Sequence, residues 1–312
     1  MSTYLVTGGA GFIGSHIVDR LVEMGESVRV IDNFATGRLE NIEHNLDKIT
    51  LVRGSIVDIN TVRQAMEGVD IVLHHAAAVS VPGSVEDPIG CNEVNVAGTL
   101  NILISARDTG VKRLVFASSS AIYGDAPILP KVEDMPPDPL SPYALTKLTG
   151  EYYCRMFTRL YGLETVSLRY FNVFGPRQDP ASQYAAVIPK FLSLMLEDRP
   201  PVIYGDGLQS RDFTYAADVV SANLLACRQP DVGGGVFNIA CGRSFTLLDL
   251  VENLNDVLGK SLKPVFEPPR PGDVKRSLAD IRKAGKLLGF SPETGFREGL
   301  EKLAAWFVGR GV

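Results

Sequence analysis

The stretch SPYALTK, from Ser141 to Lys147, places a tyrosine and a lysine four residues apart. In a helix this spacing puts Tyr143 and Lys147 on one face, one turn from each other. A free tyrosine titrates near pH ~10 and is a poor base at neutral pH, but nearby positive charge favours its phenolate form. The pair is therefore predicted to work as an acid/base device in which Lys147 lowers the pKa of Tyr143.

The segment FASSSAIYG gives this pair a context, because Ser118, Ser119 and Ser120 follow an apolar strand pattern. Residues that end a strand of a parallel sheet emerge at its carboxyl edge, where α/β folds bind ligands. A serine hydroxyl there can hydrogen-bond a substrate oxygen beside the phenol. Three serines also suit a simple strand-ending turn.

The N-terminal stretch VTGGAGFIGS predicts a dinucleotide-binding site. Gly8, Gly11 and Gly14 lie between the first strand pattern and the first helix pattern. Gly8 permits a tight turn, Gly11 lets the backbone approach a pyrophosphate, and Gly14 allows close packing of helix on strand. The N-terminus of the helix then supplies N–H donors and a positive dipole end for the phosphates.

Asp32 closes the second strand pattern, 18 residues after Gly14. A carboxylate at this place accepts hydrogen bonds from ribose hydroxyls and repels a 2′-phosphate, so the sequence favours NAD over NADP. A positively charged nicotinamide would then be the second cation that favours a Tyr143 phenolate. Capping of the next helix is the alternative role for Asp32.

Short apolar runs alternate with helix-like stretches through the first half of the chain. The apolar runs are 4–7, 27–31, 49–52, 71–74, 113–118 and 165–171, and the helix-like stretches are 13–24, 58–66 and 93–109. This alternation predicts an α/β fold, a Rossmann-like, doubly wound sheet of parallel strands with helices on both faces.

After Phe171 the alternation of strand-like and helix-like stretches ends, and residues 172–207 are rich in proline, glycine and aromatic residues. Later elements are expected as a strand at 236–239 and as helices at 142–160, 188–196, 217–227, 247–258 and one ending near 308. We expect residues 1–170 to form an NAD-binding Rossmann domain and 171–312 a smaller C-terminal α/β substrate region. The chain is expected to re-enter the first domain around 217–240.

The composition is typical of a soluble globular protein, with 312 residues of which 45% are hydrophobic and 21% charged. The net charge of −5 does not favour binding to the negatively charged backbone of a nucleic acid. The N-terminus carries no signal-peptide pattern, and no apolar run reaches the ~18 residues of a membrane span. We expect no nucleic-acid or membrane partner.

The sulfur and imidazole side chains suggest neither a disulfide framework nor a metal site. His74 and His75 are neighbours in a strand pattern, so their side chains should point to opposite faces. The scattered cysteines, which are read as reduced thiols, are Cys91, Cys154, Cys227 and Cys241. We expect a cytoplasmic protein without a metal.

Together these features resemble an extended short-chain dehydrogenase/reductase and, within that superfamily, the NAD-dependent UDP-hexose 4-epimerases of the UDP-glucose or UDP-N-acetylglucosamine type. The matching features, in order along nearly the whole chain, are TGGAGFIG, Asp32, SSSAIYG, YALTK and RYFNVFGP. The resemblance implies that Tyr143 is the acid/base and Lys147 its pKa-lowering, ribose-binding partner. It also implies that the Ser120 hydroxyl contacts the sugar O4.

The resemblance further implies a set of NAD contacts. They are Gly8, Gly11, Phe12, Ile13, Gly14, Asp32, Asn33, Gly37, Ser55, Ile56, Ala76, Ala77, Asn95, Ser118, Tyr143, Lys147 and Tyr170. The family usually has Gly-Asp-Ile after the third strand, where this chain has Gly54-Ser55-Ile56. A serine oxygen still accepts a hydrogen bond from the adenine amino group, through a weaker contact.

For the substrate, the resemblance implies a UDP-sugar held by its diphosphate, for which planar guanidinium forks are well suited. The implied contacts are Ser120, Asn172, Val187, Tyr204, Arg211, Arg270, Asp273 and Ser277. Family members restricted to UDP-glucose and UDP-galactose tend to carry a bulky aromatic residue at the position of Ser277. The serine therefore predicts room for an N-acetyl group, unless it is simply exposed and without a role.

The expected activity is an isomerase reaction of galactose metabolism, at sugar C4, through a transient 4-keto sugar. A 4,6-dehydratase or decarboxylase would need an extra acid and base, whereas Ser120 is followed by Ala121 and Ile122. Other nucleotide-sugar epimerases and a non-enzymatic dinucleotide sensor are further alternatives.

A homodimer through the predicted helices at 93–109 and 142–160 is expected, although an apolar helix face can also simply pack into the core of a single chain.

Overall fold

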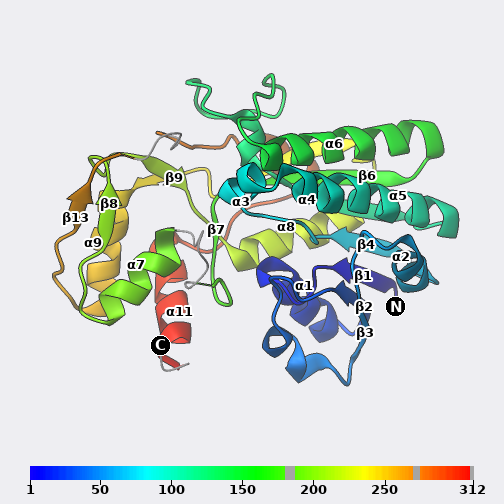
Figure 1. The fold of residues 1–312 in the computed structure, drawn as a ribbon, viewed down its shortest axis with the longest axis horizontal. Coiled ribbons are helices and arrows are strands. Elements are labelled where there is room, and N and C mark those ends of the chain that lie inside the picture. Colours follow the sequence, from blue (N-terminus) through cyan, green and yellow to red (C-terminus); the bar gives the residue numbers. More distant parts are fainter. Residues whose placement is uncertain (180–186, 270–274, 310–312) are drawn as a thin grey trace.

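Seven parallel strands form the central sheet of the computed structural model, which describes residues 1–179, 187–269 and 275–309 (Figure 1). Their order is β11-β6-β5-β4-β1-β2-β3. The bounds are β1 Thr3–Thr7, β2 Ser27–Asp32, β3 Ile49–Arg53, β4 Ile71–His74, β5 Arg113–Ser119, β6 Glu164–Tyr170 and β11 Gly235–Ile239. The predicted doubly wound α/β fold is confirmed.

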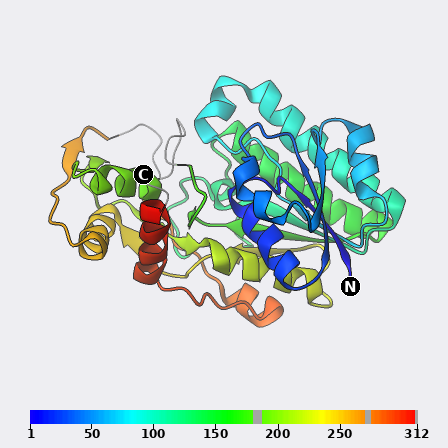
Figure 2. The ribbon, with the colours of Figure 1, turned by 90° about the horizontal axis from the view of Figure 1, so that it is seen from below.

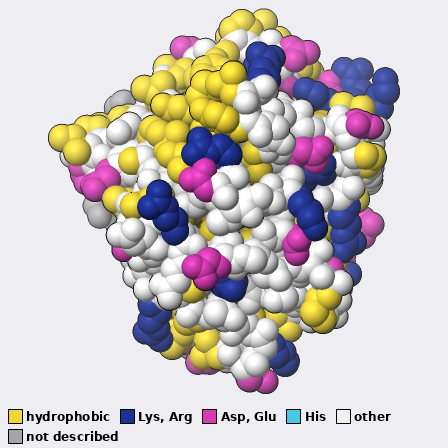
Figure 3. Space-filling view, turned by 90° about the vertical axis from the view of Figure 1, so that its right-hand side faces the viewer, with side chains coloured by type: hydrophobic (Ala, Val, Ile, Leu, Met, Phe, Trp, Pro, Cys, Tyr) yellow, Lys and Arg dark blue, Asp and Glu magenta, His cyan; other side chains and the backbone are white. Residues whose placement is uncertain are grey.

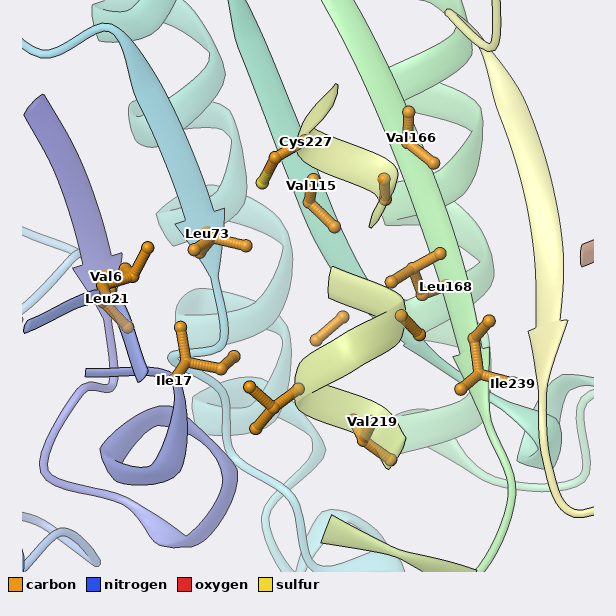
Figure 4. Close-up of a cluster of buried hydrophobic side chains, with 14 of the residues drawn as sticks. Val6, Ile17, Leu21, Leu73, Val115, Val166, Leu168, Val219, Cys227 and Ile239 are labelled. Carbon is orange, nitrogen blue, oxygen red and sulfur yellow. The ribbon is translucent and has the colours of Figure 1, made fainter. Parts of the chain in front are cut away.

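Helices cover both faces of this sheet. One face carries α1 Phe12–Glu23, α8 Ala216–Arg228 and α10 Arg282–Leu288, and the other carries α2 Ile59–Met66, α5 Gly98–Thr109 and α6 Pro142–Tyr161. Side chains alternate along each strand, so Tyr4 and Val6 pack into the first layer and Leu5 into the second. Figure 4 shows the first layer, in which Ile17 of α1 and Val219 of α8 meet strand residues such as Leu168.

Several short helices of the first half were not expected from the sequence. They are η1 Leu39–Asn41, η2 Glu43–Asn45, α3 Val81–Glu86, α4 Pro88–Asn92 and η4 Ser120–Tyr123. Ser80 and Asp87 cap α3 and α4 by accepting hydrogen bonds from backbone N–H groups, and each helix has a proline in its first turn. The predicted helix over 93–109 is in fact a π-helical turn, η3 Glu93–Ala97, followed by α5.

The second half builds its own core beside the sheet. It contains β7 Val173–Phe174, α7 Val187–Leu196, β8 Val202–Tyr204, β9 Ser210–Asp212, β10 Thr214–Tyr215, β12 Ser244–Thr246, α9 Leu247–Leu258, β13 Val265–Glu267 and α11 Phe296–Gly309. Figures 1 and 2 both place α7, α9 and α11 to one side of the sheet. Their apolar faces meet around Phe174, Phe213 and Phe296, whose rings pack against one another.

The chain does not keep its two halves separate. After β10 it returns to the sheet, where α8 packs on one face and β11 pairs in parallel with β6. The division at residue 170 into an NAD-binding and a substrate domain stays a prediction. None of the described helices has the length and apolar character needed to cross a membrane.

Candidate active site

A large cleft lies at the carboxyl edge of the sheet, between the sheet and the second half. Its volume is about 1240 Å³, and it is lined from Gly8 after β1 to Tyr170 at the end of β6. The predicted site residues that line it are Gly8, Gly11, Phe12, Ile13, Gly14, Asp32, Asn33, Gly37, Ser55, Ile56, Ala76, Ala77, Ser118, Ser120, Tyr143, Lys147, Tyr170, Asn172, Arg211 and Ser277. Parallel sheets bind ligands at this edge.

The glycine-rich turn forms one end of the cleft. Gly8 has a φ of +68°, and a Cβ there would lie 2.8 Å from the backbone nitrogen of Ala76. A Cβ on Gly14 would lie 2.2 Å from the carbonyl oxygen of Gly8, so the start of α1 packs directly on the turn. Gly11 is the N-cap of α1 and no side chain caps the helix, which leaves its first N–H groups for an anion.

Asp32 lies beside this turn and is nearly fully buried. Its carboxylate accepts hydrogen bonds from the backbone N–H groups of Ala10, at 2.9 Å, and Phe34, at 2.8 Å. A Cβ on Gly37 would come within 2.9 Å of the same carboxylate, so this glycine keeps space beside it. A negative charge fixed at the cleft in this way favours ribose hydroxyls and disfavours a 2′-phosphate.

Two buried polar atoms at the cleft have no hydrogen-bond partner within the described part of the chain. They are Nη1 of Arg177 and Oε1 of Gln178. Buried polar groups normally have partners, so these atoms are suited to a polar ligand. Together with the uncapped α1 and the carboxylate of Asp32, they fit a dinucleotide such as NAD.

Tyr143 and Lys147 lie on the first turns of α6. Ser141 caps this helix by accepting a hydrogen bond from Ala144 N, Pro142 occupies its first turn, and Tyr143 N donates to Ser84 Oγ at 3.1 Å. Lys147 Nζ lies 5.8 Å from the ring centroid of Tyr143 and donates to the carbonyl of Ala117 at 2.9 Å. The predicted helical pair is therefore present and faces the cleft.

Burial shifts the pKa values of both members of this pair in the protein without cofactor. Burial raises the pKa of Tyr143, and the hydrogen bond with Ser119 is the interaction that lowers it. Burial also lowers the pKa of Lys147 to about 8. In the protein without cofactor, burial therefore outweighs any effect of the ammonium, which is directed at a backbone carbonyl. The role of Lys147 in lowering the Tyr143 pKa beside a bound nicotinamide stays a prediction.

Ser119 is the serine whose hydrogen bond lowers the pKa of Tyr143. Ser119 is the last residue of β5, whereas Ser120 begins the short helix η4. Both serines line the cleft. Ser119 thus acts on the phenol, and the predicted contact of Ser120 with the sugar O4 stays a prediction.

A buried charge network lies behind these residues, and no sequence pattern predicted it. Glu151, one turn after Lys147 on α6, accepts a hydrogen bond from the Ser118 hydroxyl. It also forms an ion pair with Arg169 of β6 at 2.8 Å, and Arg169 donates to the Tyr123 hydroxyl at 2.8 Å. The network fixes the end of β5 against α6, and the hydroxyl of Ser118 faces Glu151 rather than the cleft.

Asn95 was also predicted to contact NAD, but it lies behind the cleft wall. It is buried and exchanges hydrogen bonds with the backbone of Ala78, at 2.7 Å and 3.0 Å, while its amide donates to Thr146 Oγ1 at 3.0 Å. Tyr170 lines the cleft and stacks against His75, with ring centroids 6.0 Å apart. Asn95 thus shapes the loop that lines the site.

The predicted substrate residues divide into three groups. Asn172, Arg211 and Ser277 line the cleft, and Arg276, which the sequence did not suggest, lines it as well. Val187 and Tyr204 are not among its lining residues. Arg270 and Asp273 lie outside the described residues.

The sequence also missed the residues that follow Pro176. Arg177, Gln178 and Asp179 line the cleft, and Asp179 pairs with Arg38 at 2.6 Å. The described lining residues carry six cationic side chains and two carboxylates, which are Arg38, Lys131, Lys147, Arg177, Arg211, Arg276, Asp32 and Asp179. In a protein of net charge −5, this concentration of positive charge favours phosphorylated ligands.

The cysteines are free thiols, and three of them are buried. His74 and His75 have pKa values lowered to about 3 by burial, and His74 lies between the hydroxyls of Thr7 and Thr99. In the part of the chain that the structure covers, no three His, Cys, Asp or Glu side chains cluster in a way that could hold a metal ion.

Known proteins give a consistent comparison. Residues 4–240 match the model of the NAD dependent epimerase/dehydratase family. The chain is 39% identical over 307 residues to the UDP-glucose 4-epimerase of Mycolicibacterium smegmatis, covering 97% of both chains.

Two solved structures are similar throughout. The UDP-N-acetylglucosamine 4-epimerase of Methanobrevibacter ruminantium M1, in complex with UDP-N-acetylmuramic acid, aligns with a TM-score of 0.95 and 43% identity over 99% of each chain. The UDP-glucose 4-epimerase of Thermus thermophilus, in complex with NAD, aligns with a TM-score of 0.89 and 39% identity over 98% of this chain and 99% of that one.

Proposed function

The chain belongs to the NAD dependent epimerase/dehydratase family, as an isomerase of the NAD-using UDP-sugar 4-epimerase type, and we propose that it interconverts UDP-glucose with UDP-galactose and UDP-N-acetylglucosamine with UDP-N-acetylgalactosamine. The relatives named above act on different UDP-sugars, so family membership alone does not choose between these pairs.

One observation carries the proposal. Tyr143, Lys147 and Ser119 face the same cleft as the glycine-rich turn and Asp32. A proton-transferring phenol and a dinucleotide site thus share one space, large enough for a cofactor and a nucleotide sugar. When bound there, NAD supplies a hydride acceptor for sugar C4 and afterwards a hydride donor to the opposite face.

The chain's own residues handle the proton. Tyr143 as phenolate takes the proton of the sugar 4-hydroxyl, and later returns a proton to the same oxygen. The Ser119 hydroxyl, already bonded to the phenol, stabilises the phenolate and orients it towards the sugar oxygen. Lys147 adds positive charge on the same side and is suited to the ribose of the cofactor.

The nucleotide half of the substrate must stay bound while the 4-keto sugar rotates to present its opposite face. Arg211 and Asn172 line the cleft on the side of the second half, where they are suited to hold a diphosphate. We keep Arg270, Asp273, Val187 and Tyr204 as proposed contacts to the nucleotide. No chemistry acts on this part, so its contacts hold both epimers equally.

Ser277 is the proposed determinant of sugar choice. It lines the cleft and is only partly exposed, so a larger side chain there would enter the substrate space. A serine leaves that space to an N-acetyl group. Acceptance of both the plain and the acetylated sugar pairs follows from this.

A dehydratase or decarboxylase on the same fold is the rival function. Such an enzyme needs a further acid and base beside the sugar. The described carboxylates that line the cleft are Asp32, bonded to Ala10 and Phe34, and Asp179, paired with Arg38. Both serve the cofactor end, so simple epimerisation fits the site better.

We also propose that the protein forms a homodimer through α6 and its neighbours, in the cytoplasm. Figure 3 shows hydrophobic side chains gathered at the upper left of one face. On α6, Leu145, Tyr152 and Leu160 are 53%, 53% and 64% exposed, and Ile89 of α4 is 80% exposed. Leu160→Glu should shift sedimentation towards the monomer, whereas Val308→Glu on α11 should not.

The decisive experiment incubates the protein separately with UDP-glucose, UDP-N-acetylglucosamine, UDP-xylose and dTDP-glucose. Products are separated by chromatography while absorbance is followed for transient NADH. The proposal expects the C4 epimers of the first two substrates at equilibrium, without net oxidation. Release of a 4-keto-6-deoxy sugar would contradict the proposed 4-epimerase activity and indicate a dehydratase. Conversion at another carbon would contradict it as well and indicate a different epimerase.

A further inference from the structure

The segment from Gly175 to Asp179 is a strap that joins the second half of the chain to the cofactor half. It directly follows β7, which pairs with β10. The carbonyl of Pro176 accepts a hydrogen bond from His16 Nε2 at 2.9 Å, and Arg177 pairs with Asp19 at 2.7 Å. His16 and Asp19 both belong to α1, the helix whose N-terminus faces the cleft.

A further link ties the strap to the loop after β2. Asp179 pairs with Arg38 at 2.6 Å, and Arg38 N donates to the carbonyl of Ala10 in the glycine-rich turn at 3.0 Å. The strap therefore spans from α1 to the loop beside Asp32. These are the elements that surround the diphosphate and ribose of a dinucleotide.

Arg177 is held in an uncommon backbone conformation within this strap. Its φ is +69°, a value that non-glycine residues seldom adopt and that often occurs at ligand sites. One terminal nitrogen, Nη2, pairs with Asp19, while Nη1 is buried without a partner among the described residues and the side chain lines the cleft. A guanidinium has a fork of donors, so one nitrogen can anchor the side chain while the other binds an anion.

We propose that the strap retains the bound cofactor and that Arg177 Nη1 donates to its diphosphate, opposite the N–H groups of α1. The partner of Nη2 lies on α1 and not in the second half, which directs Nη1 to the cofactor rather than to the UDP-sugar. Gln178 completes the strap, with its amide nitrogen fixed to the carbonyl of Val173 at 3.1 Å and Oε1 left for a ligand donor. The strap thereby keeps NAD in place through repeated turnovers.

Arg177→Lys provides the test, because a lysine keeps a cation for Asp19 and loses the second nitrogen. Arg20→Lys is the matched control, since Arg20 lies on the same α1 and pairs with Glu23 at 55% exposure. Cofactor-free proteins are titrated with NAD, ADP and adenosine in a calorimeter, with no UDP-sugar present. Arg177→Lys should weaken NAD and ADP at least about tenfold and leave adenosine unchanged, while Arg20→Lys changes none of them.

An unchanged Kd for NAD in Arg177→Lys, or an equal loss for adenosine, would overturn the proposal. Thermal unfolding of the cofactor-free variants checks that the fold is intact, and Gln178→Leu offers a second variant with an expected smaller loss for NAD. The inference rests on NAD as the cofactor and not on the identity of the sugar. A failure here is therefore distinct from a failure in the epimerase assay.

Discussion

Glu151 and Arg169 form an ion pair at 2.8 Å in which their side chains are only 1% and 5% exposed. The same carboxylate holds the hydroxyl of Ser118, one residue before the serine that bonds Tyr143. Buried charge, and not apolar side chains alone, therefore lies behind the proposed acid/base site. This arrangement is costly to disturb, because loss of one partner leaves the other uncompensated.

Glu151→Gln should lower the free energy of unfolding by about 3–5 kcal/mol, as expected when one partner of a buried ion pair is removed. Urea denaturation of the purified variant measures the change. Glu298→Gln is the control, because Glu298 pairs with Lys302 at 53% exposure and should change stability by less than ~1 kcal/mol. Equal effects in the two variants would show that burial of the pair is unimportant.

Tyr143→Phe should reduce kcat by roughly 10²- to 10⁴-fold, the loss typical of a missing general acid/base. The KM for the UDP-sugar should change little, because the nucleotide is held elsewhere. Tyr152→Phe, on the exposed side of the same helix, should retain full activity. Steady-state kinetics decide the matter, and near-normal turnover in Tyr143→Phe excludes the role of this phenol.

Ser119→Ala should lower kcat about 10- to 100-fold, because it removes the hydrogen bond that favours the phenolate. Ser120→Ala removes the hydroxyl proposed to contact the sugar O4 and should lower kcat/KM without changing the pKa of Tyr143. Comparing the two variants over a range of pH adds a second readout, in which only Ser119→Ala shifts the acidic limb of the activity profile, where the phenolate forms, towards higher pH. A shift of this limb in Ser120→Ala, and none in Ser119→Ala, would assign the hydrogen bond with the phenol to Ser120.

Ser277→Tyr should reduce kcat/KM for UDP-N-acetylglucosamine by at least about tenfold and leave UDP-glucose within about threefold. The bulky ring would take the space next to the sugar that the serine leaves open. Ser277→Ala controls for loss of the hydroxyl and should accept both sugars. A tyrosine variant with undiminished activity on acetylated sugars would refute the proposed role of Ser277 in sugar choice.

Lys147→Met should stabilise the cofactor-free protein by roughly 1–3 kcal/mol at pH 7 while it reduces activity. Burial lowers the lysine pKa from 10.5 to about 8, so the folded protein binds fewer protons than the unfolded chain between these values. The free energy of unfolding of the wild-type protein therefore rises with pH across that window, as the folded lysine loses its proton. Below pH ~8 the buried ammonium destabilises the fold by its full amount.

The advantage of Lys147→Met should accordingly shrink as the pH is raised from 8 towards 10. Chemical denaturation at pH 7 and pH 9.5 measures it, with the exposed Lys190→Met as the control. A difference that does not depend on pH would mean that the ammonium is not the source of the cost.

The sequence predicted the sheet well because its strands are buried on both faces and appear as continuous apolar runs. The bounds predicted for the helix at 247–258 are those observed, since Thr246 and Asp249 form a capping box at its start. Short elements such as α3, α4 and α10 were missed. Their stability depends on caps and neighbours rather than on a long periodic pattern.

The site was predictable where spacing alone determines geometry, as for Tyr143 and Lys147 on one helix face. It was not predictable where one residue more or less in a strand matters, because β5 ends at Ser119 and this residue, which the sequence did not single out, hydrogen-bonds the phenol. The pKa of Tyr143 depends on burial, which residue spacing does not report. Likewise Arg177 is placed at the cleft by contacts with α1, far away along the chain.

The pairing of β11 with β6 has a consequence for how the two halves can be handled. A chain cut after Tyr170 would leave β6 with a bare row of N–H and C=O groups, and loss of α8 would uncover Val115 and Leu168 to solvent. The halves are therefore interlaced and not modular. Recombining either half with a homologue's partner requires matching β11 and α8 as well as the site.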